Sequence, residues 1–151
     1  NKTNYKWEKL ELVAKAAQNL KEYYNANNLI MIGHSGGAYT LATINGRIPK
    51  LIDKTILISC PCEFEMWKKM KGERVYKMKT SPHKNINKIS KDSQTIIIVG
   101  KNDKNTFPIL SINYHEMLVK RDLKSDLFVI EGKHSSGSLI NASKIIKKFI
   151  D

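Results

Sequence analysis

Long hydrophobic runs are absent from this sequence of 151 residues. No stretch approaches the ~20 apolar residues that a membrane-spanning helix requires, so we expect a soluble protein without a membrane span. The first residues also lack the apolar core and the small-residue cleavage site of a signal peptide. The sequence begins with Asn1 rather than Met. We therefore expect a chain that has been processed, trimmed or cut from a longer one.

Cysteine is scarce: the sequence contains only Cys60 and Cys62, on either side of Pro61. Two cysteines are too few for a disulfide framework, and they lack the second ligand pair of a zinc site. In an extended segment, cysteines two residues apart would need a strained ring to bond each other. We therefore expect free thiols, which are typical of a reducing, cytoplasmic compartment.

Arginine is also scarce, although the chain is strongly basic. The net charge is +12, from 26 basic and 14 acidic residues, yet only three of the basic residues are arginine. Recognition of bases and phosphates favours the planar arginine fork, and the lysines here are scattered along the chain. We therefore expect no nucleic-acid partner, although the charge alone would favour an anionic one.

The densest basic segment covers residues 67–79, where aromatic and methionine side chains alternate with lysines. The favoured interpretation is a solvated helix face with an apolar underside. The alternative is a surface that meets acidic substrates or lipid.

The sequence does contain apolar strands that alternate with helices. Four short, continuous apolar runs occur, at residues 29–32, 55–59, 95–99 and 127–130. Such runs are typical of strands buried on both faces of a sheet. Apolar residues recur at helical spacing at residues 5–24, 38–45, 107–118 and 140–150. The alternation predicts an α/β fold with a parallel sheet, as one domain over residues 1–151 with a short polar insert at about 61–93.

Two helix ends can be predicted from single residues. Gly46 is expected to cap the carboxyl end of the helix that precedes it, because glycine commonly ends helices. Thr106 is expected to cap the amino end of the helix that Phe107 and Pro108 open.

The strongest local signal is Gly-His-Ser-Gly-Gly at residues 33–37, which fits G-x-S-x-G between an expected strand and an expected helix. In such a turn, side chains two residues before and after Ser35 would collide, which explains Gly33 and Gly37. The N–H of Gly36 would then face the oxyanion that develops when the serine attacks a carbonyl. The alternative is a glycine-rich turn with an incidental serine. Nucleotide binding is disfavoured, because no Lys-Ser/Thr pair follows and G-x-G-x-x-G is absent.

A serine nucleophile needs a base and an orienting carboxylate. Asp103 and His134 follow the third and fourth expected strands, so their order along the chain suits that chemistry. Asp103 could instead merely cap its turn. Glu63 and Glu65, just after the second strand, are the alternative candidates for the orienting carboxylate.

The remaining histidines are expected to have other roles. His83 and His115 are expected on the surface or in packing. His34 adjoins the serine and is expected to point away from it. The candidates to line a substrate pocket are His34, Met66, Trp67 and Met70.

On these motifs and strands, in this order and spacing, the chain resembles the α/β-hydrolases over nearly its whole length. Ser81-Pro82 followed by Ile86 and Ile89 is similar to the prolyl-oligopeptidase and dienelactone-hydrolase-like branches. The family's sheet normally has eight strands, and the serine turn follows the fifth. The chain therefore resembles the C-terminal portion of such a domain, without the first four strands.

The resemblance implies a serine hydrolase that cleaves a small carboxylic ester or amide through Ser35, His134 and Asp103, with no metal or organic cofactor. It also implies that the second oxyanion N–H, which the loop after the family's third strand supplies, is missing. An exposed edge at residues 29–32 would invite pairing, so we expect a preceding segment or a second chain to complete the sheet. The alternative is a catalytically inactive, hydrolase-like scaffold domain with a basic contact surface.

Overall fold

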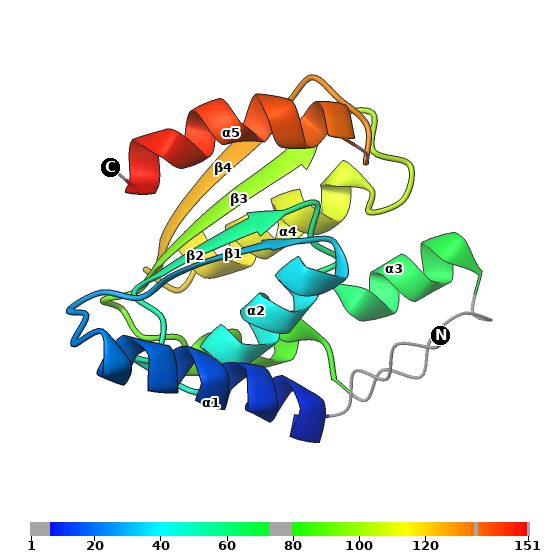
Figure 1. The fold of residues 1–151 in the computed structure, drawn as a ribbon. Helices are drawn as coiled ribbons and strands as arrows, with labels where there is room; N and C mark the ends of the chain where they lie inside the picture. Colours follow the sequence, from blue (N-terminus) through cyan, green and yellow to red (C-terminus); the bar gives the residue numbers. More distant parts are fainter. Residues whose placement is uncertain (1–6, 73–79, 135, 151) are drawn as a thin grey trace.

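The computed structural model describes residues 7–72, 80–134 and 136–150 and shows a parallel sheet between layers of helices (Figure 1). The elements in chain order are α1 (Trp7–Tyr23), β1 (Ile30–His34), α2 (Gly36–Arg47), β2 (Lys54–Ile58), α3 (Phe64–Lys71), the 3-10 helix η1 (Pro82–Lys88), β3 (Gln94–Gly100), α4 (Pro108–Val119), β4 (Lys124–Ile130) and α5 (Ser136–Ile150). None of the helices in these ranges is long and apolar enough to cross a bilayer.

The strands lie in the order β1-β2-β3-β4, and every neighbouring pair is parallel, which confirms the predicted sheet. Ile32, Ile56 and Ile96 are aligned across the first three strands. The central strands β2 and β3 are buried along nearly their whole length, as their continuous apolar runs predict. The edge strands β1 and β4 are mostly only partly buried, so the prediction of burial on both faces is wrong for them. The edge strand β4 begins three residues before the predicted run, because its polar first half still pairs with β3.

Side chains on the two faces of the sheet pack against different helices. On one face, Ile56, Ile58, Ile96 and Ile98 pack with Ala142 and its neighbours on α5. The opposite face packs against α2 and α4, and α1 lies outside α2 (Figure 1). The carboxyl ends of all four strands therefore meet at one edge between these layers, where open α/β sheets place their ligands.

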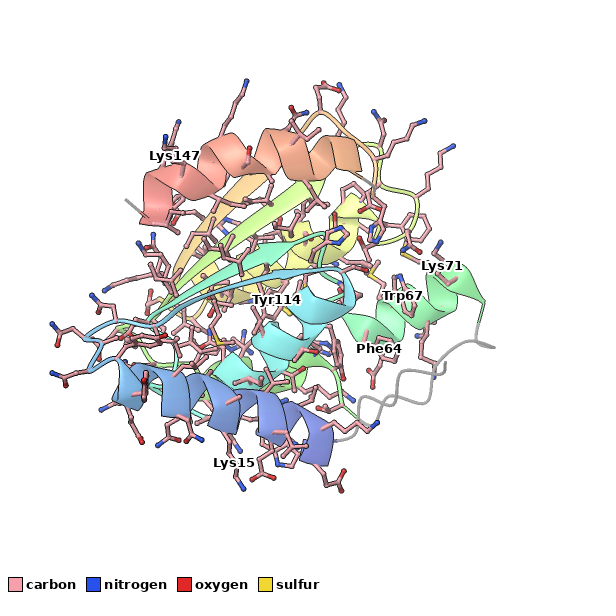
Figure 2. The ribbon with its side chains drawn as sticks, viewed as in Figure 1. Lys15, Phe64, Trp67, Lys71, Tyr114 and Lys147 are labelled. Carbon is pink, nitrogen blue, oxygen red and sulfur yellow. A yellow bond between two sulfur atoms is a disulfide. The ribbon has the colours of Figure 1, made fainter. Side chains whose placement is uncertain are left out.

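The insert between β2 and β3 forms α3 and η1 within the described residues. Phe64 and Trp67 are buried, whereas Lys69 and Lys71 on the same helix are exposed (Figure 2). The prediction of a solvated face with an apolar underside is therefore confirmed for this helix. The rest of the basic segment, residues 73–79, lies outside the described residues.

Both predictions of helix caps are wrong. Gly46 lies inside α2, where a Cβ would be 2.8 Å from Cβ and 2.9 Å from the backbone oxygen of Asn85 on η1, so glycine allows these elements to approach closely. Phe107, not Thr106, precedes α4, and the Thr106 hydroxyl bonds Asp103 instead.

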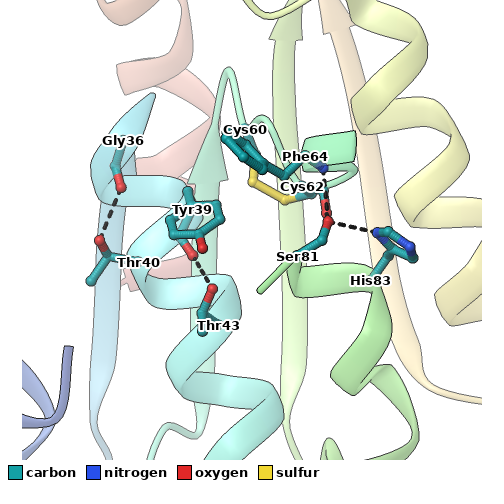
Figure 3. Close-up of a disulfide and its surroundings, with 9 residues drawn as sticks. All are labelled: Gly36, Tyr39, Thr40, Thr43, Cys60, Cys62, Phe64, Ser81 and His83. Carbon is teal, nitrogen blue, oxygen red and sulfur yellow. Dashed lines mark hydrogen bonds between the residues drawn. A yellow bond between two sulfur atoms is a disulfide. The ribbon is translucent and has the colours of Figure 1, made fainter. Parts of the chain in front are cut away.

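The prediction of free thiols is also wrong, because Cys60 and Cys62 form a disulfide (Figure 3). The prediction assumed an extended backbone at residues 60–62, and the structure does not have one there. The two Cα atoms come within 5.1 Å, inside the range that a disulfide spans. Because the cysteines are bonded to each other, they give no support for a reducing compartment.

Candidate active site

Ser35 occupies the sharp turn between β1 and α2. Its backbone has φ 54° and ψ −115°, a conformation that costs a non-glycine residue about 1–3 kcal/mol. Hydrogen bonds hold the turn on both sides: Ser35 N donates to Ile58 O at 2.9 Å, and Tyr39 N donates to Ser35 O at 3.0 Å. The strain is therefore maintained by a buried strand and a buried helix.

The two flanking glycines have different roles. A Cβ at Gly33 would lie 2.6 Å from the carbonyl carbon of Gly37 and 2.7 Å from Ala38 N, so only glycine fits there. A Cβ at Gly37 would meet no atom within 4 Å. The prediction that both positions must be small is therefore correct for Gly33 and wrong for Gly37.

Gly36 is the first residue of α2. Its N–H is one of the first N–H groups of the helix, which have no partner within the helix and form the positive end of its dipole. An anion beside Ser35 would be stabilised at this place.

The structure brings Ser35, His134 and Asp103 together, although 99 residues separate the serine from the histidine. Ser35 Oγ lies 3.0 Å from His134 Nε2, and His134 Nδ1 lies 2.8 Å from Asp103 Oδ2. An ionised carboxylate only accepts hydrogen bonds, so Nδ1 carries the proton. The other ring nitrogen, Nε2, then faces the Ser35 hydroxyl.

Asp103 is buried, with only 2% of its surface exposed. Its Oδ1 accepts hydrogen bonds from Asn105 N and Thr106 N, both at 2.8 Å, so it does cap its turn. Its Oδ2 faces His134. The carboxylate therefore both caps its turn and contacts the His134 ring.

These contacts set the ionisation of Asp103. Burial raises its pKa, but the hydrogen bonds from His134 and Thr106 outweigh that effect and bring the pKa below its ordinary value. Asp103 is therefore a carboxylate at neutral pH.

Thr106 belongs to this group, and sequence reasoning missed it. Its hydroxyl donates to Asp103 Oδ2 at 2.8 Å and lies 3.1 Å from His134 Nδ1. The spacing of three residues after the aspartate is a signal that could have identified it, because a turn capped by an aspartate brings that residue back to the carboxylate.

His34 lies closer to this group than the sequence predicts. Its Nε2 is 3.0 Å from the backbone oxygen of His134, and the two imidazole rings are 5.0 Å apart. Because a carbonyl oxygen only accepts, His34 donates this hydrogen bond from Nε2.

The candidate pocket residues on α3 differ in exposure. Trp67 is buried, and its Nε1 donates to Asn105 O at 2.6 Å, beside the Asp103 turn. Met66 is partly buried, and Met70 is 42% exposed.

The alternative carboxylates and the remaining histidines have partners elsewhere. Glu63 accepts a hydrogen bond from Asn113, and Glu65 forms an ion pair with Lys84. His83 contacts the hydroxyl of Ser81, and His115 that of Ser125; the first pair is shown in Figure 3.

No protein-family model matches the sequence, and comparison with curated proteins found no match. Solved structures do match. Dipeptidyl peptidase 4 of Porphyromonas gingivalis has a TM-score of 0.75 and 16% identity, over 93% of this chain and 22% of that one. An esterase of Pyrococcus furiosus has a TM-score of 0.73 and 14% identity, over 95% of this chain and 60% of that one. An acylaminoacyl peptidase has a TM-score of 0.70 and 12% identity, over 86% of this chain and 25% of that one.

These likenesses, with the parallel sheet, show that the chain has the α/β-hydrolase fold. The predicted fold class is confirmed. The chain spans between 22% and 60% of the length of these solved chains, so it corresponds to a part of them.

Proposed function

We propose that this chain is a serine hydrolase that cleaves carboxylic ester or amide bonds through an acyl-enzyme. One observation carries the proposal: Ser35 Oγ, His134 and Asp103 form a continuous series of hydrogen-bonding contacts of 3.0 and 2.8 Å. The esterases and peptidases among the structures that share this fold support the same class of reaction.

In this mechanism, Ser35 Oγ attacks the acyl carbon while His134 Nε2 takes its proton. The tetrahedral intermediate collapses when Nε2 returns that proton to the leaving group, and an acyl ester on Ser35 remains. A water molecule then repeats the two steps, and the acid product leaves. Asp103 holds the ring in the required tautomer and stabilises the imidazolium between steps.

The oxyanion of each tetrahedral intermediate would bind at Gly36 N–H. Other serine enzymes lose about 2.7–4 kcal/mol of transition-state stabilisation when one oxyanion donor is removed. A second donor is therefore expected to matter for the rate.

We further propose that an additional strand, from a preceding segment or a second chain, pairs with β1. Within the described residues β1 pairs only with β2, and Ile32 is 47% exposed. A free apolar edge attracts another strand. The loop attached to that strand would supply the second oxyanion donor. Slow hydrogen exchange of β1 amides in the active form, compared with fast exchange in a monomer of this chain alone, tests the pairing.

Met66 and Met70 are proposed to line a pocket for a small acyl group, with Trp67 as its buried wall. The support is their common position on α3, where the Trp67 indole is bonded to the loop that carries Asp103. We favour a small acyl ester over a peptide as the substrate.

Steady-state hydrolysis of p-nitrophenyl acetate and butyrate tests the proposal. Ser35→Ala and His134→Ala are expected to abolish turnover. His115→Ala is the matched control, because His115 contacts Ser125 rather than the proposed catalytic group, and it should retain activity. Equal rates for the wild type and Ser35→Ala would contradict the proposal and favour an inactive scaffold domain.

A further inference from the structure

The order of the sheet creates a problem of distance for the proposed reaction. Ser35 follows β1 and His134 follows β4, and these strands form opposite edges of the described sheet. Three strand spacings of about 4.8 Å each separate the edges by roughly 14 Å. The segment that carries His134 must therefore reach back across the ends of β2 and β3 to meet the serine.

Part of that segment is held by the neighbouring elements. Gly132 O accepts a hydrogen bond from Asn102 N at 3.0 Å, and Glu131 O accepts one from Asn141 Nδ2 at 2.9 Å. These contacts anchor the beginning of the segment on the side of β3 and α5. They do not reach the backbone of His134 itself.

The backbone of His134 is held from the opposite side, by His34 Nε2 at 3.0 Å from its carbonyl oxygen. His34 is the last residue of β1 and directly precedes Ser35. Its backbone is paired with Ile58 on β2, so its own position is determined by the sheet. Two consecutive residues therefore supply the serine and the donor that holds the histidine backbone.

We propose that His34 is a positioning residue, which sets the distance between Ser35 Oγ and the His134 ring by holding the His134 carbonyl. The inference rests on the proposed function. It assigns His34 a role in orienting the base and not in contacting the substrate. Because a misplacement of about 1 Å can cost about 100-fold in rate, loss of this contact is expected to lower kcat by between ~10- and ~100-fold.

Two substitutions separate the hydrogen bond from the ring. His34→Phe keeps an aromatic ring next to His134 but removes the donor. His34→Gln places an amide N–H close to the position of Nε2. We expect kcat to fall in His34→Phe with KM unchanged, and to recover most of its value in His34→Gln. The rate of labelling by a fluorophosphonate should follow kcat in all three proteins.

Several outcomes would overturn the inference. An unchanged kcat in His34→Phe would show that the contact does not position the base. A raised KM with unchanged kcat would show that His34 lines the pocket. Equal losses in both variants would show that the hydrogen bond is not the relevant feature.

Thermal unfolding of each variant identifies any loss that comes from misfolding. His34→Leu provides a second variant without the donor if His34→Phe does not fold. Failure of the proposed function is distinguishable, because the wild type itself would then neither turn over substrate nor react at Ser35.

Discussion

The hydroxyl of Thr106 donates a hydrogen bond of 2.8 Å to Oδ2 of Asp103, the same carboxylate oxygen that faces His134. Thr106 is 1% exposed, so water cannot replace this donor if the hydroxyl is removed. Hydrogen bonds to charged groups contribute about 1.5–3 kcal/mol. The contact therefore gives Thr106 a measurable influence on the carboxylate.

Thr106→Val tests that influence, because valine keeps the shape of the side chain and lacks the hydroxyl. We expect kcat/KM to fall by about 10-fold, which corresponds to roughly 1.4 kcal/mol. Thr106→Ser keeps the donor and should stay within a few-fold of the wild type. Equal activity of the valine and serine variants in ester hydrolysis would show that the hydroxyl has no part in orienting Asp103.

The two glycines beside Ser35 should respond differently to the same substitution. Gly33→Ala places a Cβ 2.6 Å from backbone that cannot move freely, so we expect a loss of about 1–3 kcal/mol or more in the free energy of unfolding. Gly37→Ala enters open space within a helix and is expected to be neutral or to stabilise by up to ~1 kcal/mol. Urea unfolding measures both. Similar free energies for the two variants would contradict the assigned roles.

The ionisation of Asp103 makes the stability of the protein depend on pH. Its folded-state pKa lies below the ordinary value of 3.8, so the carboxylate stabilises the fold above that pH and stops doing so as the pH falls through the lower folded-state value. Asp103→Asn cannot ionise. We expect the wild type to be more stable than Asp103→Asn at pH 7, by about 1.5–3 kcal/mol, with the difference narrowing below pH ~4. Urea titrations at several pH values measure it, and a difference that is constant with pH would contradict the assignment.

The disulfide predicts the chemical state of the cysteines. The unfolded protein should not react with Ellman's reagent unless it has first been reduced. After reduction, two thiols per chain should react. Because the bond closes a very short loop, its loss is expected to cost only about 1–2 kcal/mol in the chain-entropy model. Two reactive thiols in the unreduced, unfolded protein would show that Cys60 and Cys62 are free.

Much of the fold and the proposed site could be predicted from the sequence. Continuous apolar runs indicate buried parallel strands, and in such a sheet the carboxyl ends of the strands share one edge. Residues as distant as Ser35, Asp103 and His134 could therefore be expected to meet, because each follows a strand.

The parts that were missed depend on contacts between segments that are distant in sequence or on local backbone turns. Gly46 resembles a helix cap until η1 is found against it, and Thr106 resembles one until its hydroxyl is found on Asp103. Cys60 and Cys62 lie close enough to bond because the backbone between them is not extended, and hydrophobic periodicity does not report such a local turn. The direction of His34 likewise depends on where the segment after β4 returns.

The most direct test of the proposed reaction is the site at which a fluorophosphonate attaches. After incubation with diisopropyl fluorophosphate, tandem mass spectrometry should find one adduct, on Ser35. His134→Ala should form that adduct far more slowly, and Ser35→Ala should form none. If the folded protein, with its sheet completed by the additional strand, gains no adduct or gains it at another serine, Ser35 is not an activated nucleophile and the proposed hydrolase activity is wrong.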